Sequence, residues 1–292
     1  WAFLQCSGHC RWLMKFGIII FTTEYSIEPA ELAIAAEERG IESLWFPEHS
    51  HIPLSRLSPF PGGGELPKMY CDVFDPFVAL GAAASVTSKI MIGTGICLVV
   101  QRDPIQLAKE TSTLDTISNG RFLFGIGAGW NADEMKNHGT NNFKERFSLM
   151  NERVAAIKSI WLNERASFSG DYVNFDKIIA YPKPTTKPHP PIFVGGGFPH
   201  GARRALQYGD AWMPSGVSSS GMDIYQVLPR FRQMAAEFGR EPDEVPVTYF
   251  NLDPNIKEIN KLEDAGVERV VFALPSKKRD IILPILDKLV KS

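Results

Sequence analysis

The stretch Lys89–Trp130, KIMIGTGICLVVQRDPIQLAKETSTLDTISNGRFLFGIGAGW, reads as strand, helix and strand. The apolar run Ile90–Ile96 ends at a glycine-rich break, and Arg121–Ile126 is apolar on both faces, as buried parallel strands are. Between them, Asp103-Pro104 begins a helix, because Asp accepts hydrogen bonds from free helical N–H groups and Pro fits the first turn. Asn119-Gly120 ends that helix, since both residues tolerate positive φ. Two strands joined by one helix predict a right-handed parallel βαβ unit.

The alternation of short apolar runs with helical segments continues along the rest of the chain. Six further runs read as strands: Phe16–Phe21, Ser43–Phe46, Pro191–Val194, Asp210–Met213, Val245–Phe250 and Arg269–Leu274. Helices are expected between them, among others at Pro29–Arg39, Pro76–Val86 and Phe143–Asn163. Eight strands that alternate with helices favour a (β/α)8 TIM barrel over an open doubly wound sheet. In that fold the active site lies at the C-terminal ends of the strands, so the residues that follow each strand are the candidates for chemistry.

Two segments of the predicted barrel depart from the regular alternation. Ile52–Asp75 follows the second strand, is rich in Pro and Gly, and has the length of a lid or binding loop. Ser167–Pro184 precedes the fifth strand and resembles a surface hairpin. We therefore expect a single α/β barrel domain with a long loop after strand 2, which closes the site, and a hairpin insertion before strand 5.

Composition and charge exclude several classes of protein. The net charge is −2 over 292 residues, so we expect neither nucleic acid nor an anionic membrane surface as a partner. No apolar run reaches the ~18 residues that are needed to span a bilayer. The four cysteines do not form a dense framework, which favours a reducing, cytoplasmic location.

The first thirteen residues, WAFLQCSGHCRWL, differ from the rest of the chain. They show no periodicity and lack the features of a signal peptide, whereas a clear strand begins directly after them. Cys6, His9 and Cys10 are too few for a structural zinc site, which has four ligands in most cases. We interpret residues 1–13 as a non-native or disordered extension and 14–292 as the barrel domain, and we predict no metal site.

His49 follows the second strand and is the first candidate for proton transfer. An imidazole titrates near neutral pH and can both donate and accept a proton. The alternative is a structural histidine bonded to a neighbouring loop. Glu48 is the second catalytic candidate, because it can orient His49 or serve as an acid. Glu48 is equally suited to act as a cap or as a partner for Arg56.

Gly195, Gly196 and Gly197 end the fifth strand and precede a helix. Free backbone N–H groups and the positive end of a helix favour an anion such as phosphate. Arg203 and Arg204 are near enough in sequence to add positive charge, with one of them expected to face solvent. A tight turn without a ligand is the alternative, although three consecutive glycines exceed what a turn needs.

The segment Gly125-x-Gly127-x-Gly129 ends the fourth strand but is not a dinucleotide fingerprint, because its third glycine is misplaced. Asp133 and Glu134 follow it and are interpreted as first-turn acids of a helix rather than as catalytic groups. The sequence shows no metal-ligand cluster, Walker loop or Ser/His/Asp arrangement.

Three blocks of the sequence form a combined pattern. The first, within Gly93–Trp130, contains R-x-P-x-x-x-A-K, T-L-D-x-x-S-x-G-R and G-x-G-x-G-W. The second comprises PIFVGGG and ARRALQYGDAW within Pro191–Trp212, and the third is SLWFPEH at Ser43–His49. Together they resemble the luciferase-like monooxygenase superfamily. The likeness covers Met14 to about Ser215 well and the last two strand–helix units loosely.

The resemblance implies a TIM barrel whose mouth holds either coenzyme F420 or FMN. The Glu48-His49 pair is most similar to the deazaflavin-dependent oxidoreductases of the superfamily, which implies that His49 lies near the reacting face. The Gly195–Gly197 turn with Arg203 would hold the cofactor phosphate. Trp130 stands where the sugar-phosphate dehydrogenases of this group have an acid, so their substrate and acid role do not transfer.

The same resemblance implies further cofactor contacts at the matching positions of this sequence. Gly95 and Ile96 correspond to a non-prolyl cis peptide that backs the cofactor ring. Gly127, Ala128 and Gly129 would approach the ring or its side chain, since backbone without large side chains permits a close approach.

We therefore predict an oxidoreductase that transfers a hydride between coenzyme F420 and a small organic substrate. One alternative is an FMN-dependent monooxygenase that is fed by a separate reductase, and another is a non-catalytic flavin-binding barrel. The resemblance also implies a homodimer. The sequence does not name the substrate.

Overall fold

The computed structural model describes residues 14–216, 223–241, 243–253 and 256–290. The segment 1–13, which we interpreted as an extension, lies outside the described residues.

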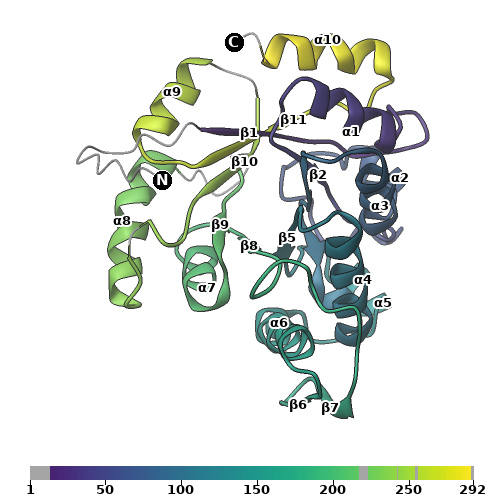
Figure 1. The fold of residues 1–292 in the computed structure, drawn as a ribbon, viewed down its shortest axis with the longest axis vertical. Helices are drawn as coiled ribbons and strands as arrows, with labels where there is room; N and C mark the ends of the chain where they lie inside the picture. The colour runs from purple at the N-terminus through teal and green to yellow at the C-terminus, as the bar shows by residue number, and fades with distance from the viewer. Residues whose placement is uncertain (1–13, 217–222, 242, 254–255, 291–292) are drawn as a thin grey trace, which may run out of the picture.

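Eight parallel strands form the centre of the described chain (Figure 1). They are β1 (Lys15–Ile19), β2 (Ser43–Phe46), β3 (Met91–Thr94), β5 (Phe122–Gly127), β8 (Ile192–Gly195), β9 (Ala211–Met213), β10 (Thr248–Leu252) and β11 (Arg269–Ala273). These strands follow one another around the sheet in chain order, and β11 pairs with β1. Two bridges, Trp212 to Val247 and Ser215 to Phe250, join β9 to β10. The strands thus form the nearly closed (β/α)8 barrel that the sequence predicts.

Helices cover the outside of this barrel (Figure 1). The longer ones are α1 (Pro29–Glu38), α3 (Pro76–Val86), α4 (Pro104–Ile117), α6 (Arg146–Leu162), α7 (His200–Tyr208), α8 (Ile224–Glu237), α9 (Ile256–Asp264) and α10 (Arg279–Leu289). Short helices occur in the loops at α2 (Met69–Asp72), η1 (Val99–Gln101), α5 (Ala132–Asn137) and η2 (Phe143–Glu145). The first turn of α5 contains Asp133 and Glu134, as the sequence predicts.

The predicted βαβ unit is present as β3, α4 and β5. Asp103 caps α4, where its carboxylate accepts from the N–H groups of Ile105 at 3.0 Å and Gln106 at 2.9 Å. The helix is followed by Asn119 and Gly120, both with positive φ. Capping and termination therefore follow the local sequence, because each depends on residues within one turn of the helix end.

Apart from β2, the predicted strands differ from the observed ones by one to three residues at their ends, and two of these differences have a visible cause. The first strand of the βαβ unit ends at Thr94, before a cis peptide between Gly95 and Ile96, and a short strand β4 (Cys97–Leu98) then pairs with β5. The strand predicted from Val245 begins only at Thr248. Pro246 precedes it, and a proline has no N–H to donate to a neighbouring strand.

Side chains fill the interior of the barrel. Successive residues of a strand point to opposite sides, so Trp45 faces the interior while Leu44 and Phe46 pack under the helices. The interior cluster comprises Ile19, Trp45, Leu123, Phe193, Ala211, Met213, Phe250 and Val271. Ligand chemistry is therefore expected beyond this packed layer, at the C-terminal ends of the strands.

Both predicted departures from the alternation are observed. Strands β6 (Ala166–Ser169) and β7 (Asn174–Ile178) pair antiparallel and form the hairpin before β8. The loop after β2 is irregular except for α2, and it returns to the barrel at Asp75, which caps α3.

Candidate active site

His49 lies in the loop that follows β2, at the C-terminal end of the barrel strands. Its Nδ1 atom is 2.8 Å from Oε2 of Glu134, and the two side chains are 6% and 0% exposed. The backbone N–H of Ser50 donates to the other oxygen of Glu134 at 3.1 Å. Asn131 caps α5 by accepting from the Glu134 N–H. Two elements that follow different strands thus hold one imidazole against one carboxylate.

The contact with Glu134 leaves Nε2 of His49 for chemistry. Among the described residues, no hydrogen bond involves this atom. We assign the ring proton to Nδ1, because a carboxylate at that position favours the N–H tautomer that donates to it. Nε2 is then an acceptor in the neutral ring and a donor in the charged ring. The arrangement can therefore take up a proton and return it.

Tyr70 and Trp130 pack against this histidine, Phe60 packs against both of them and Phe21 against Tyr70, and these four residues are called the aromatic wall below. The His49 ring centroid is 5.4 Å from that of Tyr70 and 5.7 Å from that of Trp130. Phe60 lies 5.2 Å from Tyr70 and 6.1 Å from Trp130, and Phe21 lies 4.5 Å from Tyr70. Burial raises the pKa of Tyr70, so its hydroxyl is neutral near pH 7. Apolar surroundings strengthen the electrostatic interactions of His49.

Two of these rings come from the loop that was expected to close the site. Phe60 and Tyr70 both belong to the segment 52–75, which also bonds to α5, where the hydroxyl of Ser58 accepts from the N–H of Ala132 at 2.9 Å. The loop therefore lies over His49 rather than away from the barrel.

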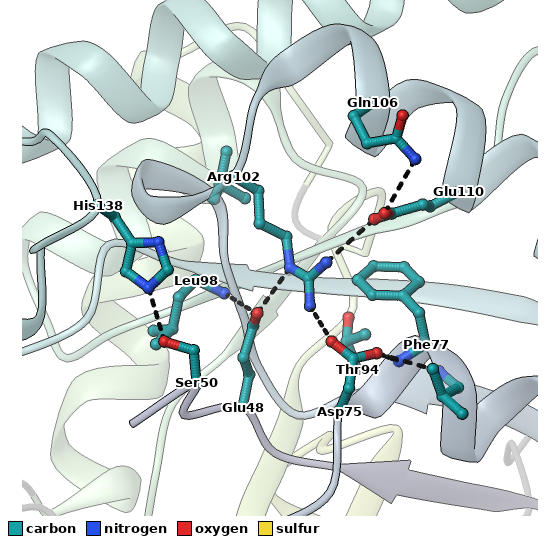
Figure 2. A network of polar contacts seen from close by, with 12 residues as sticks. Glu48, Ser50, Asp75, Phe77, Thr94, Leu98, Arg102, Gln106, Glu110 and His138 are labelled. Carbon is teal, nitrogen blue, oxygen red and sulfur yellow. Dashed lines mark hydrogen bonds and ion pairs between the residues drawn. The ribbon is translucent and has the colours of Figure 1, made fainter. Parts of the chain in front are cut away.

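Glu48, the other predicted catalytic residue, is 6% exposed and has a different set of partners. Its Oε2 accepts from the N–H of Leu98 and its Oε1 accepts from Nε of Arg102, both at 2.6 Å (Figure 2). Burial raises the pKa of Glu48, and the positive charge of Arg102 offsets part of that rise. An arginine partner was one expectation for Glu48, but the partner is Arg102 and not Arg56.

Sequence reasoning did not identify Glu134 as the partner of His49. It placed Glu134 correctly in the first turn of a helix, but a first-turn acid is usually explained by the helix dipole. The available signal was its position after the fourth barrel strand, because the C-terminal ends of all barrel strands meet at one mouth.

Glycines at or directly after the C-terminal ends of β3, β5 and β8 lie around Ile96. The Gly95–Ile96 peptide is cis, as the resemblance implied. A Cβ atom at Gly127 would overlap Cδ1 of Ile96, and one at Gly195 would lie 3.4 Å from Cγ2 of Ile96. Beyond them, Gly129 has φ +74°. A side chain at Gly127 would therefore displace Ile96, whereas one at Gly195 would only touch it.

The turn after β8 contains Gly195, Gly196 and Gly197 and leads into α7. Gly196 has φ +121°, and a Cβ there would lie 3.3 Å from Nη2 of Arg204. Arg203 is exposed and faces the ring of Phe238 at 5.8 Å. The arginine that approaches the glycine turn is therefore Arg204, and Arg203 points elsewhere.

Arg204 and Arg146, the first residue of α6, lie against one aromatic ring and are called the arginine cluster below, and Arg153 follows two turns further along α6. The guanidinium carbons of Arg204 and Arg146 lie 3.9 Å and 4.3 Å from the ring centroid of Phe147. Burial lowers the pKa of all three arginines. The Nε atom of each is buried without a hydrogen-bond partner, and no ion pair of the described residues includes them.

These features fit a phosphate-bearing cofactor. Buried Nε donors without partners are costly unless an anion binds them, although Nη1 of Arg146 and of Arg153 each donate to a backbone carbonyl. Arg204 lies beside a glycine turn whose backbone can approach a ligand closely, at the start of a nine-residue helix. The sequence pointed to the glycines but not to Arg146, because the two helices meet only in the folded barrel.

The part of the chain that the structure describes lacks both a metal-ligand cluster and a membrane-spanning helix. It contains no group of three or more His, Cys, Asp or Glu side chains that would hold a metal ion. None of its helices has the length and apolar character needed to cross a bilayer.

Comparison with known proteins places these features in a family. The sequence profile of the luciferase-like monooxygenase family matches residues 14–252. The chain is 34% identical to the uncharacterized protein Rv0953c of Mycobacterium tuberculosis over 281 residues, which cover 94% of this chain and 97% of that protein. It is 30% identical over 212 residues to the F420-dependent hydroxymycolic acid dehydrogenase of the same organism, with 72% of this chain and 54% of that protein covered.

A solved structure supports the same fold. An F420-dependent secondary alcohol dehydrogenase, in complex with an F420–acetone adduct, superposes with a TM-score of 0.74 at 21% identity, covering 95% of this chain and 97% of that chain. The cofactors of the family are F420 and FMN. The chain therefore belongs to the luciferase-like monooxygenase family, whose members are oxidoreductases that depend on F420 or on a flavin.

Proposed function

We propose that this protein transfers a hydride between coenzyme F420 and a small organic substrate, with His49 as the residue that exchanges the accompanying proton. The observation that carries the proposal is the buried contact of 2.8 Å between His49 Nδ1 and Glu134 Oε2. Sequence similarity to F420-dependent dehydrogenases at about 30% identity supports the choice of cofactor.

The residues around His49 determine how the proton moves. When a substrate hydroxyl is oxidised, Nε2 accepts its proton, and the Glu134 carboxylate stabilises the imidazolium that forms. In the reverse direction Nε2 donates the proton to the oxygen of a carbonyl substrate. The aromatic wall excludes water, which would otherwise compete for this proton.

The cofactor contacts follow from the turn after β8 and from the Gly95–Ile96 peptide. Arg204 and Arg146 would hold the phosphate at the Gly195–Gly197 turn, with Arg204 in the role that the sequence suggested for Arg203. Ile96 would lie behind the ring. When bound, the deazaflavin supplies the hydride chemistry itself, and the protein supplies binding and orientation.

The arginine cluster also supports the FMN-dependent monooxygenase with a separate reductase as a second candidate. Arg146 and Arg204 carry no carboxylate partner among the described residues, and such a pair suits the doubly charged phosphate monoester of FMN. The homodimer, the cytoplasmic location and the non-catalytic barrel remain predictions from the sequence.

A binding experiment separates these candidates. The melting temperature is measured with F420 and with FMN at the same concentration, so that the ligand with the lower dissociation constant stabilises more, by about 2.7 kcal/mol once its concentration reaches about 100 times that constant. We expect a rise with F420 that exceeds the rise with FMN. Oxidation of a panel of small alcohols with F420 is then followed by absorbance, and His49→Ala is expected to bind the cofactor but lose turnover. A rise with FMN alone would favour the monooxygenase, and a rise with neither would refute both enzyme proposals.

A further inference from the structure

A partly buried ion pair between a glutamate and an arginine flanks strand β2 at each end. At its N-terminal end, Glu42 accepts from Nε and Nη2 of Arg269 at 2.8 Å and 2.7 Å. At its C-terminal end, Glu48 accepts from Nε of Arg102 at 2.6 Å. Only the second pair lies at the mouth of the barrel, directly before His49.

Glu48 connects two segments whose position relative to each other matters for the proposed reaction. One carboxylate oxygen binds Arg102 and the other binds the N–H of Leu98 at 2.6 Å. Glu48 is covalently joined to His49, and Leu98 follows the Gly95–Ile96 peptide by two residues. A single carboxylate therefore links the segment that carries the proton acceptor to the segment expected behind the cofactor ring.

Arg102 extends this link to two further elements (Figure 2). Its Nη2 donates to Oδ2 of Asp75 at 2.6 Å, and its Nη1 donates to Oε2 of Glu110 in α4 at 3.1 Å. The guanidinium also lies 4.7 Å from the ring centroid of Phe77. Asp75 ends the long loop and caps α3. One side chain thus fixes the β2 loop, the end of the long loop and α4 relative to one another.

We propose that Glu48 and Arg102 form a positioning pair that sets the place of His49 relative to the Gly95–Ile96 segment, and that Glu48 does not transfer a proton. Both carboxylate oxygens of Glu48 accept hydrogen bonds from fixed donors, one of them the guanidinium of Arg102, which is the pattern of a structural carboxylate. The proton-transfer role stays with His49, whose partner is Glu134. This inference rests on the proposed function.

The positioning role predicts a particular result for Glu48→Gln. The amide can accept with only one atom, so either the Leu98 N–H or Arg102 Nε loses its acceptor. A displacement of about 1 Å at a reacting group can reduce rates by about 100-fold. We expect kcat to fall by about 10- to 100-fold, a smaller change in KM, and an unchanged shape of the pH profile of kcat/KM.

Glu42→Gln is the matched control, because it makes the same change in the equivalent pair at the far end of the same strand. It is expected to lower the melting temperature as Glu48→Gln does, while kcat stays within about twofold of the wild type. If Glu48→Gln reduced kcat no more than Glu42→Gln does, the pair would be structural only. If Glu48→Gln removed one limb of the pH profile, Glu48 would be the acid. Either result overturns the proposal.

A second measurement does not depend on turnover. In the protein without cofactor, the long-range ¹H–¹⁵N spectrum of the histidine rings reports the environment of His49. We expect Glu48→Gln to shift the His49 signals and Glu42→Gln to leave them in place. Absence of a shift in both variants overturns the positioning pair, whereas a shift without any cofactor binding by the wild type would refute only the proposed function.

Discussion

The imidazole of His49 and the carboxylate of Glu134 are in contact at 2.8 Å, although 85 positions of sequence separate them. Each residue follows a different barrel strand, and the parallel pairing of β2 and β5 with the intervening β3 brings the two loops to the same end of the barrel. The contact fixes the ring through Nδ1, and Nε2 is the ring nitrogen that it leaves. The proposed proton transfer depends on this relationship.

Glu134→Gln tests the contact directly. The amide retains the shape but does not stabilise an imidazolium, and it can present its NH2 group to Nδ1 and favour the wrong tautomer. We expect kcat to fall by about 100-fold with little change in cofactor affinity, measured by steady-state kinetics and by titration. Asp133→Asn changes the neighbouring acid of the same turn and should retain near wild-type kcat. Equal activity of the two variants would contradict the role of Glu134.

Arg204→Met is expected to weaken binding of the phosphate-bearing cofactor. Loss of a hydrogen bond to a charged group costs about 1.5–3 kcal/mol, which corresponds to an increase in Kd of roughly 10- to 100-fold. Arg203→Met removes the adjacent charge, which faces Phe238 and not the glycine turn, and should change Kd by less than about threefold. The Kd values are measured by titration of cofactor absorbance. A larger effect of Arg203→Met would return the phosphate role to the residue that the sequence suggested.

Phe60→Ala tests whether the long loop contributes to the site. The side chain contacts Tyr70 and Trp130, and each aromatic pair is worth about 0.5–1.5 kcal/mol. We expect KM for an apolar substrate to rise by about tenfold. Leu57→Ala, at a side chain that is 77% exposed in the same loop, serves as the control and should leave KM unchanged. Similar kinetics for both variants would show that the loop does not contribute to binding.

The Glu42–Arg269 pair predicts how stability depends on pH. Burial raises the pKa of Glu42, but the hydrogen bond and charge of Arg269 outweigh this, so the net pKa is lowered. A carboxyl of this kind stabilises the fold above its unfolded pKa of about 4.3, and the stabilisation is lost as pH falls through the lower folded pKa. Glu42→Gln should therefore lower the unfolding free energy by about 2 kcal/mol at pH 7 and by less below about pH 4.

Urea unfolding of both proteins between pH 7 and pH 3 checks this expectation. The two stability curves should approach each other on the acid side. Curves that stay parallel would mean that the pKa of Glu42 is not lowered by Arg269.

Much of the fold follows from local sequence. Strand β2 and helix α3 have the bounds that the sequence predicts, because apolar patterning and caps act within a few residues. The Asp103 cap and the Asn119-Gly120 stop of α4 are likewise read from adjacent residues. The predicted start of β10 at Val245 is wrong by three residues, because Pro246 has no N–H to donate to a neighbouring strand.

The features of the candidate site also divide into those that follow from the sequence and those that depend on the tertiary structure. The sequence by itself determined the barrel, the mouth at which His49 and the glycine turns gather, and the resemblance to the family. Only the tertiary structure decided that Glu134 and not Glu48 contacts His49, that Glu48 pairs with Arg102, and that Arg204 rather than Arg203 approaches Gly196. Adjacent helical residues differ by about 100° in direction, and partners on separate elements meet only after the barrel closes, so no local pattern records these contacts.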